Sequence, residues 1–231
     1  MKKRNKLLES LVQKRSKSLE EKNQELEKEI IERKKMEDSL RCANNEIEKN
    51  NFKLQITMEK LQEMSRTDPL TKLPNRRYMI ERIKEEMKQY ETHQKPFTIV
   101  MTDIDFFKKF NDNYGHDCGD FVLIEISKII KSLIRQEDFA SRWGGEEFLL
   151  LLCDTTSTQA INLTEKLRKK IESKKFVFEG KPMYVTMTFG LANFDENLGL
   201  DGSIQNADKA LYDGKNKSRN CCVVYEDEPD Q

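Results

Sequence analysis

Apolar residues recur every seven positions along the first 65 residues, a stretch that contains neither proline nor glycine. A seven-residue period sustained over this length is typical of a left-handed coiled coil. We therefore predict that residues 1–65 form a long helix that pairs with a second copy, giving a homodimer. A single solvated helix or a disordered charged segment is the alternative. The apolar series is Val12, Leu19, Leu26, Leu40, Ile47, Leu54 and Leu61, with Arg33 at its one break.

The second core series that a coiled coil uses is much more polar in this stretch. Arg15, Lys22, Glu29 and Asn50 occupy four of its positions. Polar residues at core positions lower stability, and a core asparagine favours one register. The predicted pairing is therefore weak and adjustable, which suits a helix that carries a signal.

After residue 65 the pattern changes to short apolar runs that alternate with amphipathic segments. The periodicity predicts helices at 76–90, 120–134, 157–171 and 205–216, and strands at 97–102, 149–152, 184–189 and 223–225. Residues 111–119 are predicted to be a loop, Ser157 to cap a helix, and Asp68-Pro69 to favour a helix start. Interleaved strands and helices predict one α/β domain over residues 66–231.

Two glycines and two carboxylates stand directly before the most apolar run of this domain. The order is Arg142, Trp143, Gly144, Gly145, Glu146, Glu147 and Phe148, followed by four leucines. We expect the glycines to supply the positive φ of a tight hairpin and to let a ligand approach the backbone. Adjacent carboxylates repel unless a cation neutralises them, so the glutamates indicate a cation site. The alternative interpretation of this stretch is a surface turn with two solvated glutamates. For Asp103, which follows the strand predicted at 97–102, the alternative to a metal ligand is a residue that forms a turn at the strand end.

Composition narrows the classes of protein that this chain can belong to. The formal net charge is +0, so no general basic surface indicates a nucleic-acid partner. The five cysteines are odd in number and show no metal-ligand spacing, which favours a reducing cytosol. No apolar run approaches the ~18 residues of a membrane helix. We expect a cytoplasmic protein, either complete or the cytoplasmic part of a larger membrane sensor.

Four further motifs accompany the glycine–glutamate stretch, at residues 68–77, 103–112, 115–120 and 207–220. Together the five resemble, in the same order, the motifs of the GGDEF family, the diguanylate cyclases, in its Gly-Gly-Glu-Glu-Phe variant. The resemblance covers Thr67 to about Tyr225 and leaves the first third of the chain outside it. It implies an α/β GGDEF domain: a central five-stranded mixed sheet wrapped by helices, similar to adenylyl cyclase and polymerase palms, and preceded here by the coiled-coil helix.

The resemblance also implies an activity, the condensation of two GTP into cyclic di-GMP with release of two pyrophosphates. It implies two Mg²⁺ ions per active site, with Mn²⁺ as the alternative ion. The implied metal ligands are Asp103, the Ile104 carbonyl, Glu146 and Glu147, and Glu147 has the alternative role of helping to deprotonate the 3′-hydroxyl. The implied substrate contacts are Phe106, Phe107, Lys108, Gly144, Gly145, Lys215 and Arg219 at the phosphates, and Asn111 and Asp120 at the guanine edge.

Each site of this family holds one GTP, so two sites must face each other, and the paired helices would bring them together. Arg135 and Asp138 fit the family's RxxD motif for inhibition by cyclic di-GMP, with Lys166 or Arg168 as an assistant. A helix-end ion pair is the alternative for that motif. For the whole chain, the alternatives are a catalytically silent GTP or cyclic di-GMP receptor, a structural scaffold, and an enzyme that makes mixed GMP–AMP products. An upstream sensor or partner protein would supply the stimulus.

Two departures from the family pattern fall in the last motif. Gly214 stands where alanine is usual before Lys215, and Ser218 stands where glycine is usual before Arg219. Glycine inside a helix lowers its stability. These departures loosen the C-terminal helix and weaken the assignments of Lys215 and Arg219.

Overall fold

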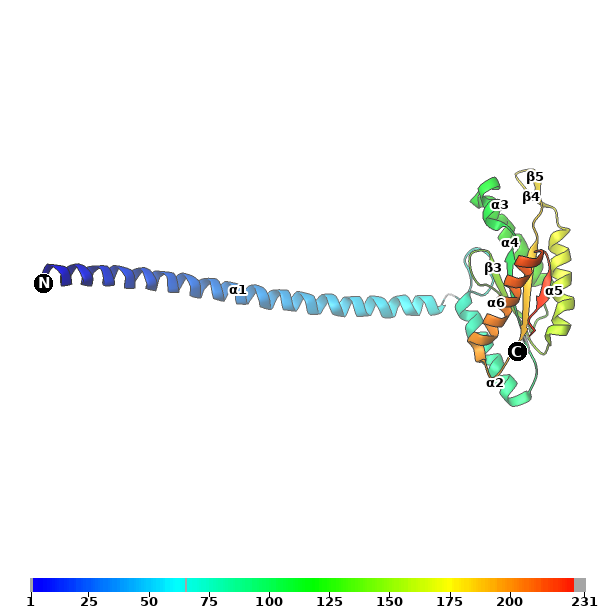
Figure 1. Cartoon of the computed structure of the whole chain (residues 1–231), viewed down its shortest axis with the longest axis horizontal. Coiled ribbons are helices and arrows are strands. Elements are labelled where there is room, and N and C mark those ends of the chain that lie inside the picture. Colours follow the sequence, from blue (N-terminus) through cyan, green and yellow to red (C-terminus); the bar gives the residue numbers. More distant parts are fainter. Residues whose placement is uncertain (1, 65, 227–231) are drawn as a thin grey trace. The chain divides into compact units, whose positions relative to one another are not determined.

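The computed structural model describes residues 2–64 and 66–226, and it leaves out the side chains of residues 2–13, 16, 18, 21, 24 and 59–64. The chain divides into two compact units, residues 1–64 and residues 65–231 (Figure 1). Among the described residues, no helix combines the length and apolar character that crossing a membrane requires.

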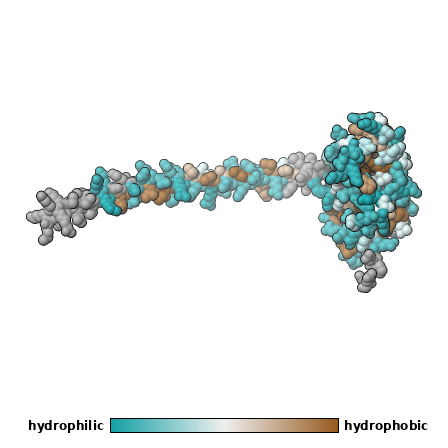
Figure 2. All heavy atoms as spheres, turned by 45° about the horizontal axis from the view of Figure 1, so that its top comes forward, coloured by the Kyte–Doolittle hydropathy of each residue, from teal (hydrophilic) through white to brown (hydrophobic). Residues whose placement is uncertain are grey.

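The first unit is one helix, α1, which runs from Lys2 to Met64. The apolar series at every seventh position forms a seam along this helix. Its described residues are each between 52% and 62% exposed: Leu19, Leu26, Leu40, Ile47 and Leu54. Figure 2 shows apolar residues of this helix interspersed among charged ones. The side chains of Val12 and Leu61, also predicted for the seam, lie outside the described residues. The helix is as predicted, and its pairing remains a prediction.

The second unit is built on a five-stranded mixed sheet, as the resemblance implied. The strand order is β2-β3-β1-β6-β7, in which β6 and β7 are parallel and the other neighbours antiparallel. A separate two-stranded ribbon pairs β4 with β5. The strands are β1 (Thr98–Ile104), β2 (Phe139–Arg142), β3 (Glu147–Leu152), β4 (Phe176–Phe178), β5 (Lys181–Met183), β6 (Met187–Asn193) and β7 (Cys222–Val224).

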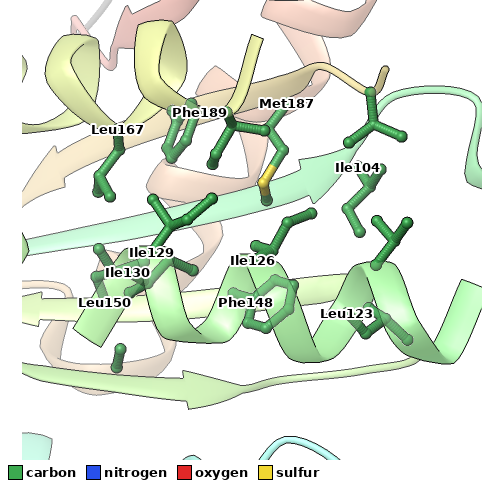
Figure 3. Packing of buried hydrophobic residues seen from close by; sticks show 14 of the residues in the cluster. Ile104, Leu123, Ile126, Ile129, Ile130, Phe148, Leu150, Leu167, Met187 and Phe189 are labelled. Atoms are coloured by element: carbon green, nitrogen blue, oxygen red, sulfur yellow. The ribbon is translucent and has the colours of Figure 1, made fainter. Parts of the chain in front are cut away.

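Helices cover both faces of this sheet. The helices α4 and α5 pack on one face and contribute residues to the first apolar cluster. The helices α2 and α6 pack on the other face and contribute residues to the second apolar cluster. Residues of β3 alternate between the clusters: Phe148 and Leu150 belong to the first, and Leu149 and Leu151 to the second. Figure 3 shows the first cluster, in which Leu167 and Phe189 pack with β3 and α4 residues. The helices are α2 (Arg76–His93), α3 (Phe107–Tyr114), α4 (His116–Leu133), α5 (Ser157–Glu172) and α6 (Gly199–Lys217).

The loop predicted at residues 111–119 is wrong. Helix α3 continues to Tyr114, and α4 begins at His116. Gly115 lies between them with φ of +85°, a conformation that glycine adopts without steric cost. One glycine therefore reverses the chain between two helices, where the sequence pattern indicated a longer loop.

Several predicted element starts also differ. Thr156, rather than Ser157, caps α5, because it forms a reciprocal capping box with Gln159. Asp68-Pro69 lies in a turn instead of starting a helix, and Asn75 caps α2. The helix predicted at 205–216 begins six residues earlier, since apolar residues of its first turns pack on the core despite two glycines. The strand predicted at 184–189 is β6, which starts later and runs to Asn193.

Candidate active site

The pairing of β1 with β3 brings the predicted metal-binding carboxylates to one end of the sheet. Asp103 lies opposite Glu147 in the antiparallel register. The backbone N–H of Ile104 donates to the carbonyl of Glu146 at 3.4 Å. Asp103 at the end of β1 therefore lies near Glu146 and Glu147 at the start of β3, although more than 40 residues separate it from them in sequence.

The turn at residues 143–147 is closed by its own backbone. The N–H groups of Trp143 and Gly144 donate to the carbonyl of Glu147 at 2.8 and 3.3 Å. Neither Gly144 nor Gly145 has a positive φ, so that part of the prediction is wrong. A Cβ at Gly144 would lie 2.5 Å from Oε2 of Glu147, and a Cβ at Gly145 would meet nothing within 4 Å. A side chain at Gly144 would displace the end of the Glu147 side chain, and Gly145 borders open space, so this turn leaves room for a ligand to approach the backbone.

Arg142 fastens this turn to the chain segment that follows the first helix. Its Nε and Nη2 atoms donate to the carbonyl of Gly145 at 3.1 and 2.8 Å, and its Nη1 lies 3.4 Å from Asp68. Asp68 also accepts hydrogen bonds from the N–H and hydroxyl of Thr71. Burial would raise the pKa of Asp68, but these hydrogen bonds and the Arg142 charge outweigh it and lower that pKa. Asp68 is therefore a charged partner that holds Arg142 in contact with the turn.

One lysine faces the acidic cluster. Lys215, near the end of α6, lies 2.9 Å from Oδ2 of Asp103. Burial, together with the neighbouring Glu147 and Asp105 charges, raises the pKa of Asp103 even though Lys215 opposes the shift. Burial and the Asp103 charge likewise raise the pKa of Glu146. The site therefore concentrates more negative charge than Lys215 neutralises.

This surplus of carboxylate oxygens fits a hard divalent cation such as Mg²⁺. Among residues 2–64 and 66–226, no three His, Cys, Asp or Glu side chains are gathered closely enough to hold an ion by themselves. Mg²⁺ usually keeps several waters and takes one or two protein carboxylates together with substrate phosphates. The residues at this end of the sheet fit that incomplete kind of site.

The start of α3 lies beside the acidic cluster and offers donors for anions. Phe106 precedes the helix with φ of +57° and is 55% exposed, and Phe107 is 5% exposed, so only its backbone can face a ligand. The first N–H groups of a helix lack intrahelical partners and bind phosphate readily. The guanidinium of Arg219 lies 4.4 Å from the centre of the Phe106 ring, and Lys108 is exposed. These cations and amides together can bind phosphate groups.

The two residues assigned to the guanine edge come from consecutive helices. Asn111 lies in α3 and Asp120 in α4, where Asp120 is exposed. The Oδ1 atom of Asn111 is buried and has no hydrogen-bond partner among the residues that the structure describes. A Cβ at Gly119 would lie 2.0 Å from that oxygen, so a larger residue would force the Asn111 side chain to move where the helices meet.

Comparison with known proteins decides the family. Residues 65–221 match the model described as "Diguanylate cyclase, GGDEF domain". The chain belongs to the GGDEF family. It is 40% identical over 169 residues to diguanylate cyclase A of Treponema denticola, an alignment that covers 71% of this chain and 46% of that protein. The chain thus spans less than half the length of that relative.

Solved structures of GGDEF proteins share this fold. The diguanylate cyclase SiaD of Pseudomonas aeruginosa, solved with its activator SiaC, is 33% identical, with a TM-score of 0.68, and the match covers 96% of this chain and 87% of that one. The active GGEEF domain of a diguanylate cyclase from Vibrio cholerae is 30% identical, with a TM-score of 0.63, covering 68% of this chain and 99% of that one.

A cavity of about 480 Å³ in this GGDEF domain contains the RxxD residues. Asp138 is 7% exposed, and its two oxygens accept the N–H groups of Arg135 and Cys153 at 3.0 and 3.1 Å. Arg135 and Asp138 thus meet through a backbone N–H and a carboxylate. Of the two predicted assistants, Lys166 lines the cavity, whereas Arg168 pairs with glutamates of its own helix.

Sequence reasoning gave no role to Asp105 and none to the Arg142–Asp68 contact. Asp105 stands only two residues beyond Asp103, and this spacing was the one signal of it in the sequence. Arg142 and Asp68 are 74 positions apart, so their pairing depends on the fold. Both features tie the active-site loops to the sheet.

Proposed function

We propose that this chain is a diguanylate cyclase, which condenses two GTP into cyclic di-GMP and releases two pyrophosphates. The observation that carries this proposal is the convergence of Asp103, Glu146 and Glu147 at the end of β1 and β3, with Lys215 on Asp103. In each of two equivalent steps, a 3′-oxygen of one nucleotide bonds to the α-phosphorus of the other. The bond from that phosphorus to pyrophosphate breaks, and the hydroxyl proton is lost.

We assign Asp103, the Ile104 carbonyl and Glu146 to the binding of two divalent ions, Mg²⁺ or Mn²⁺. When bound, such ions activate an attacking hydroxyl and stabilise a leaving phosphate. Glu147 acts at the same place, as a further ligand or as acceptor of the hydroxyl proton. The raised pKa values of Asp103 and Glu146 support the assignment, because uncompensated carboxylates favour a bound cation.

The remaining residues of the site hold the nucleotide. The N–H groups at the start of α3, with Lys108, Lys215 and Arg219, bind the β- and γ-phosphates, and the open backbone at Gly144 and Gly145 lets the nucleotide lie close. Asn111 and Asp120 accept hydrogen bonds from N1 and N2 of guanine. Adenine offers no equivalent pair of donors, so GTP is favoured over ATP. The unpartnered Oδ1 of Asn111 and the exposed carboxylate of Asp120 support this assignment.

Incubation of the full chain with Mg²⁺ and a mixture of GTP and ATP tests the reaction and its base preference together. The proposal predicts cyclic di-GMP as the product. A mixed GMP–AMP product would contradict the base assignment. Binding of GTP without any turnover would instead identify a silent receptor.

Two such sites must face each other, and we propose that paired α1 helices bring them together. The exposed apolar residues along α1 support pairing, since burying them in a dimer is favourable. Changes in the register of α1, caused by an upstream sensor or a partner protein, would then control activity. The solved complex of SiaD with its activator SiaC shows that a similar protein is activated by a partner. GTP as substrate and five free thiols favour a cytoplasmic location.

We also propose that cyclic di-GMP inhibits the enzyme at the cavity that contains Arg135 and Asp138. Arg135 is exposed, and Lys166 adds a second cation to the lining, so the cavity suits a phosphate-bearing ligand. The Asp138 carboxylate keeps acceptor capacity beyond its two backbone hydrogen bonds, and it can receive a guanine donor.

Replacing Arg135 by Ala is expected to relieve this inhibition. Loss of a charge-assisted hydrogen bond should raise the concentration of cyclic di-GMP that halves the initial rate by roughly ten-fold or more. The measurement is the initial rate of pyrophosphate release against added cyclic di-GMP. The exposed Lys181→Ala on β5 serves as the control and should leave inhibition unchanged. An unaltered inhibition curve for Arg135→Ala would refute the site.

A further inference from the structure

Asp105 is a buried carboxylate that the proposed reaction does not use. It is 7% exposed and lies directly after the last residue of β1. A carboxylate this deeply buried needs hydrogen bonds or a cation to offset its lost hydration. Its partners therefore indicate what it does.

Three donors surround this carboxylate, and none of them carries a charge. The hydroxyl of Thr188 donates to Oδ1 at 2.6 Å, and the hydroxyl of Thr186 donates to Oδ2 at 2.7 Å. The backbone N–H of Asn220 also donates to Oδ2, at 3.0 Å. Asp105 thus joins the end of β1 to the start of β6 and to the loop between α6 and β7.

The loop at residues 218–221, to which Asp105 is hydrogen-bonded, has an unfavourable backbone conformation. Arg219 and Asn220 have φ of +53° and +46°, in the left-handed region that costs energy for residues other than glycine. Such a conformation persists only when surrounding contacts impose it. The hydrogen bond from the Asn220 N–H to Asp105 is one such contact, and a second links the same N–H to the Thr188 hydroxyl at 3.1 Å.

The side chain of Asn220 is held from the opposite direction by α5. Its Nδ2 donates to Glu172 at 2.7 Å, and its Oδ1 accepts from Arg168 at 3.0 Å. With the backbone held by Asp105 and the side chain by α5, Asn220 is fixed at both ends. Arg219, the preceding residue, is then directed toward the Phe106 ring at 4.4 Å.

We propose that Asp105 is a positioning residue for the phosphate end of the site: by holding Asn220, it fixes Arg219 beside Phe106 and the start of α3. The proposal rests on the proposed function only in assigning phosphate binding to Arg219. It predicts that loss of the Asp105 carboxylate weakens binding of the triphosphate and leaves the contacts with guanine in place.

Asp105→Asn, made in the full chain, tests this proposal. Asparagine keeps the shape but removes the negative charge and replaces one acceptor oxygen with an NH₂ group, so the hydrogen bonds that hold the Asn220 N–H and the two threonine hydroxyls are weakened. The affinity for α,β-methylene GTP, which cannot release pyrophosphate, should fall at least about ten-fold by calorimetry. The affinity for GMP should change less than about two-fold, since a merely damaged domain would lose both. Asp201→Asn, an exposed change in the first turn of α6, is the matched control.

Thr186→Val provides a second variant, should Asp105→Asn fail to fold. It keeps the side-chain volume and removes one donor to Asp105 without removing a direct contact to Asn220, so a smaller change with the same selectivity is expected. Hydrogen exchange of the amides at 218–221 should be faster in both variants, a readout that needs no catalytic activity. Equal losses for the two nucleotides, or unchanged exchange and affinity in both variants, would overturn the proposal. A parent chain that binds the analogue but never turns over GTP would refute the enzyme assignment and leave this one standing.

Discussion

Replacing Asp103 by Asn is expected to abolish turnover of GTP and, at the same time, to raise the temperature of unfolding at neutral pH. If Asp103 holds metal at the reacting phosphate as proposed, its removal should cost several kcal/mol of transition-state stabilisation, or roughly a thousand-fold in rate. The gain in stability has a separate cause. Burial raises the pKa of Asp103, so the ionised carboxylate is less favourable in the folded chain than in the unfolded one.

The pH dependence of this gain follows from the direction of the shift. A raised pKa in the folded state contributes stability below the unfolded pKa, and this contribution is lost as the pH rises through the folded pKa. Asparagine is therefore favoured at neutral pH, and its advantage should vanish as the pH falls below about 4, where Asp103 becomes protonated in both states. Lys215, left without its partner, is 30% exposed and can be hydrated.

Thermal unfolding of Asp103→Asn and of the parent at several pH values, together with turnover at neutral pH, checks both parts. Asp201→Asn is again the matched control: it should leave turnover unchanged and should not raise the unfolding temperature, since an acid in the first turn of a helix is stabilising. Retention of a tenth or more of the parent rate would contradict the role in catalysis. A lower unfolding temperature at neutral pH would show that the Lys215 contact outweighs the cost of burial.

Disrupting the seam of α1 is expected to make activity strongly dependent on protein concentration. Leu40 and Ile47, each 57% exposed in the single helix, lie in the apolar series, and aspartates there would place repelling charges in a paired core. Tethering through the helix raises the effective concentration of one site near the other, an effect worth on the order of 10²-fold or more. The rate per enzyme of the double variant should fall by about that factor at nanomolar concentration and recover as concentration rises.

The rate per enzyme and the sedimentation coefficient, both measured across concentration, test this expectation. The control carries Lys34→Asp and Asn45→Asp, two exposed positions of α1 that lie off the apolar series. It should keep the behaviour of the parent. If the double seam variant matches the parent at the lowest concentration, α1 does not bring the two sites together.

Elements whose residues contact a continuous core could be predicted from the sequence. The run from Phe148 to Leu152 is apolar without interruption because its residues alternate between two clusters, one on each face of the sheet. The helical period of residues 76–90 reflects Met79 and Ile83, which are completely buried on the inner face of α2. Apolar period and burial have the same cause in these segments, so the pattern identifies them.

Features that depend on single backbone conformations or distant partners could not be predicted. Gly115 separates two helices with one left-handed residue, and the sequence around it is polar enough to resemble a loop. Gly144 leaves room for the Glu147 carboxylate, a proximity that only the folded turn creates. The β4–β5 ribbon pairs strands of three residues each, too short for a period to appear.

In the candidate site too, some residues could be predicted from the sequence and others only from the fold. The resemblance to the GGDEF motifs singled out Asp103, Glu146, Glu147 and Lys215, which the register of β1 with β3 and the end of α6 bring together. It gave no indication of Asp105, whose partners Thr188 and Asn220 lie 83 and 115 positions away. Residues that touch a ligand carry recognisable motifs, whereas residues that position them are identified by the fold.

The decisive experiment for the proposed activity is turnover of GTP with Mg²⁺, measured with product identification across protein concentration. We predict cyclic di-GMP and pyrophosphate in a ratio of one to two, with a rate per enzyme that reaches a plateau as the chains pair. Formation of GDP or GMP, or the absence of any nucleotide product at every concentration, would contradict it.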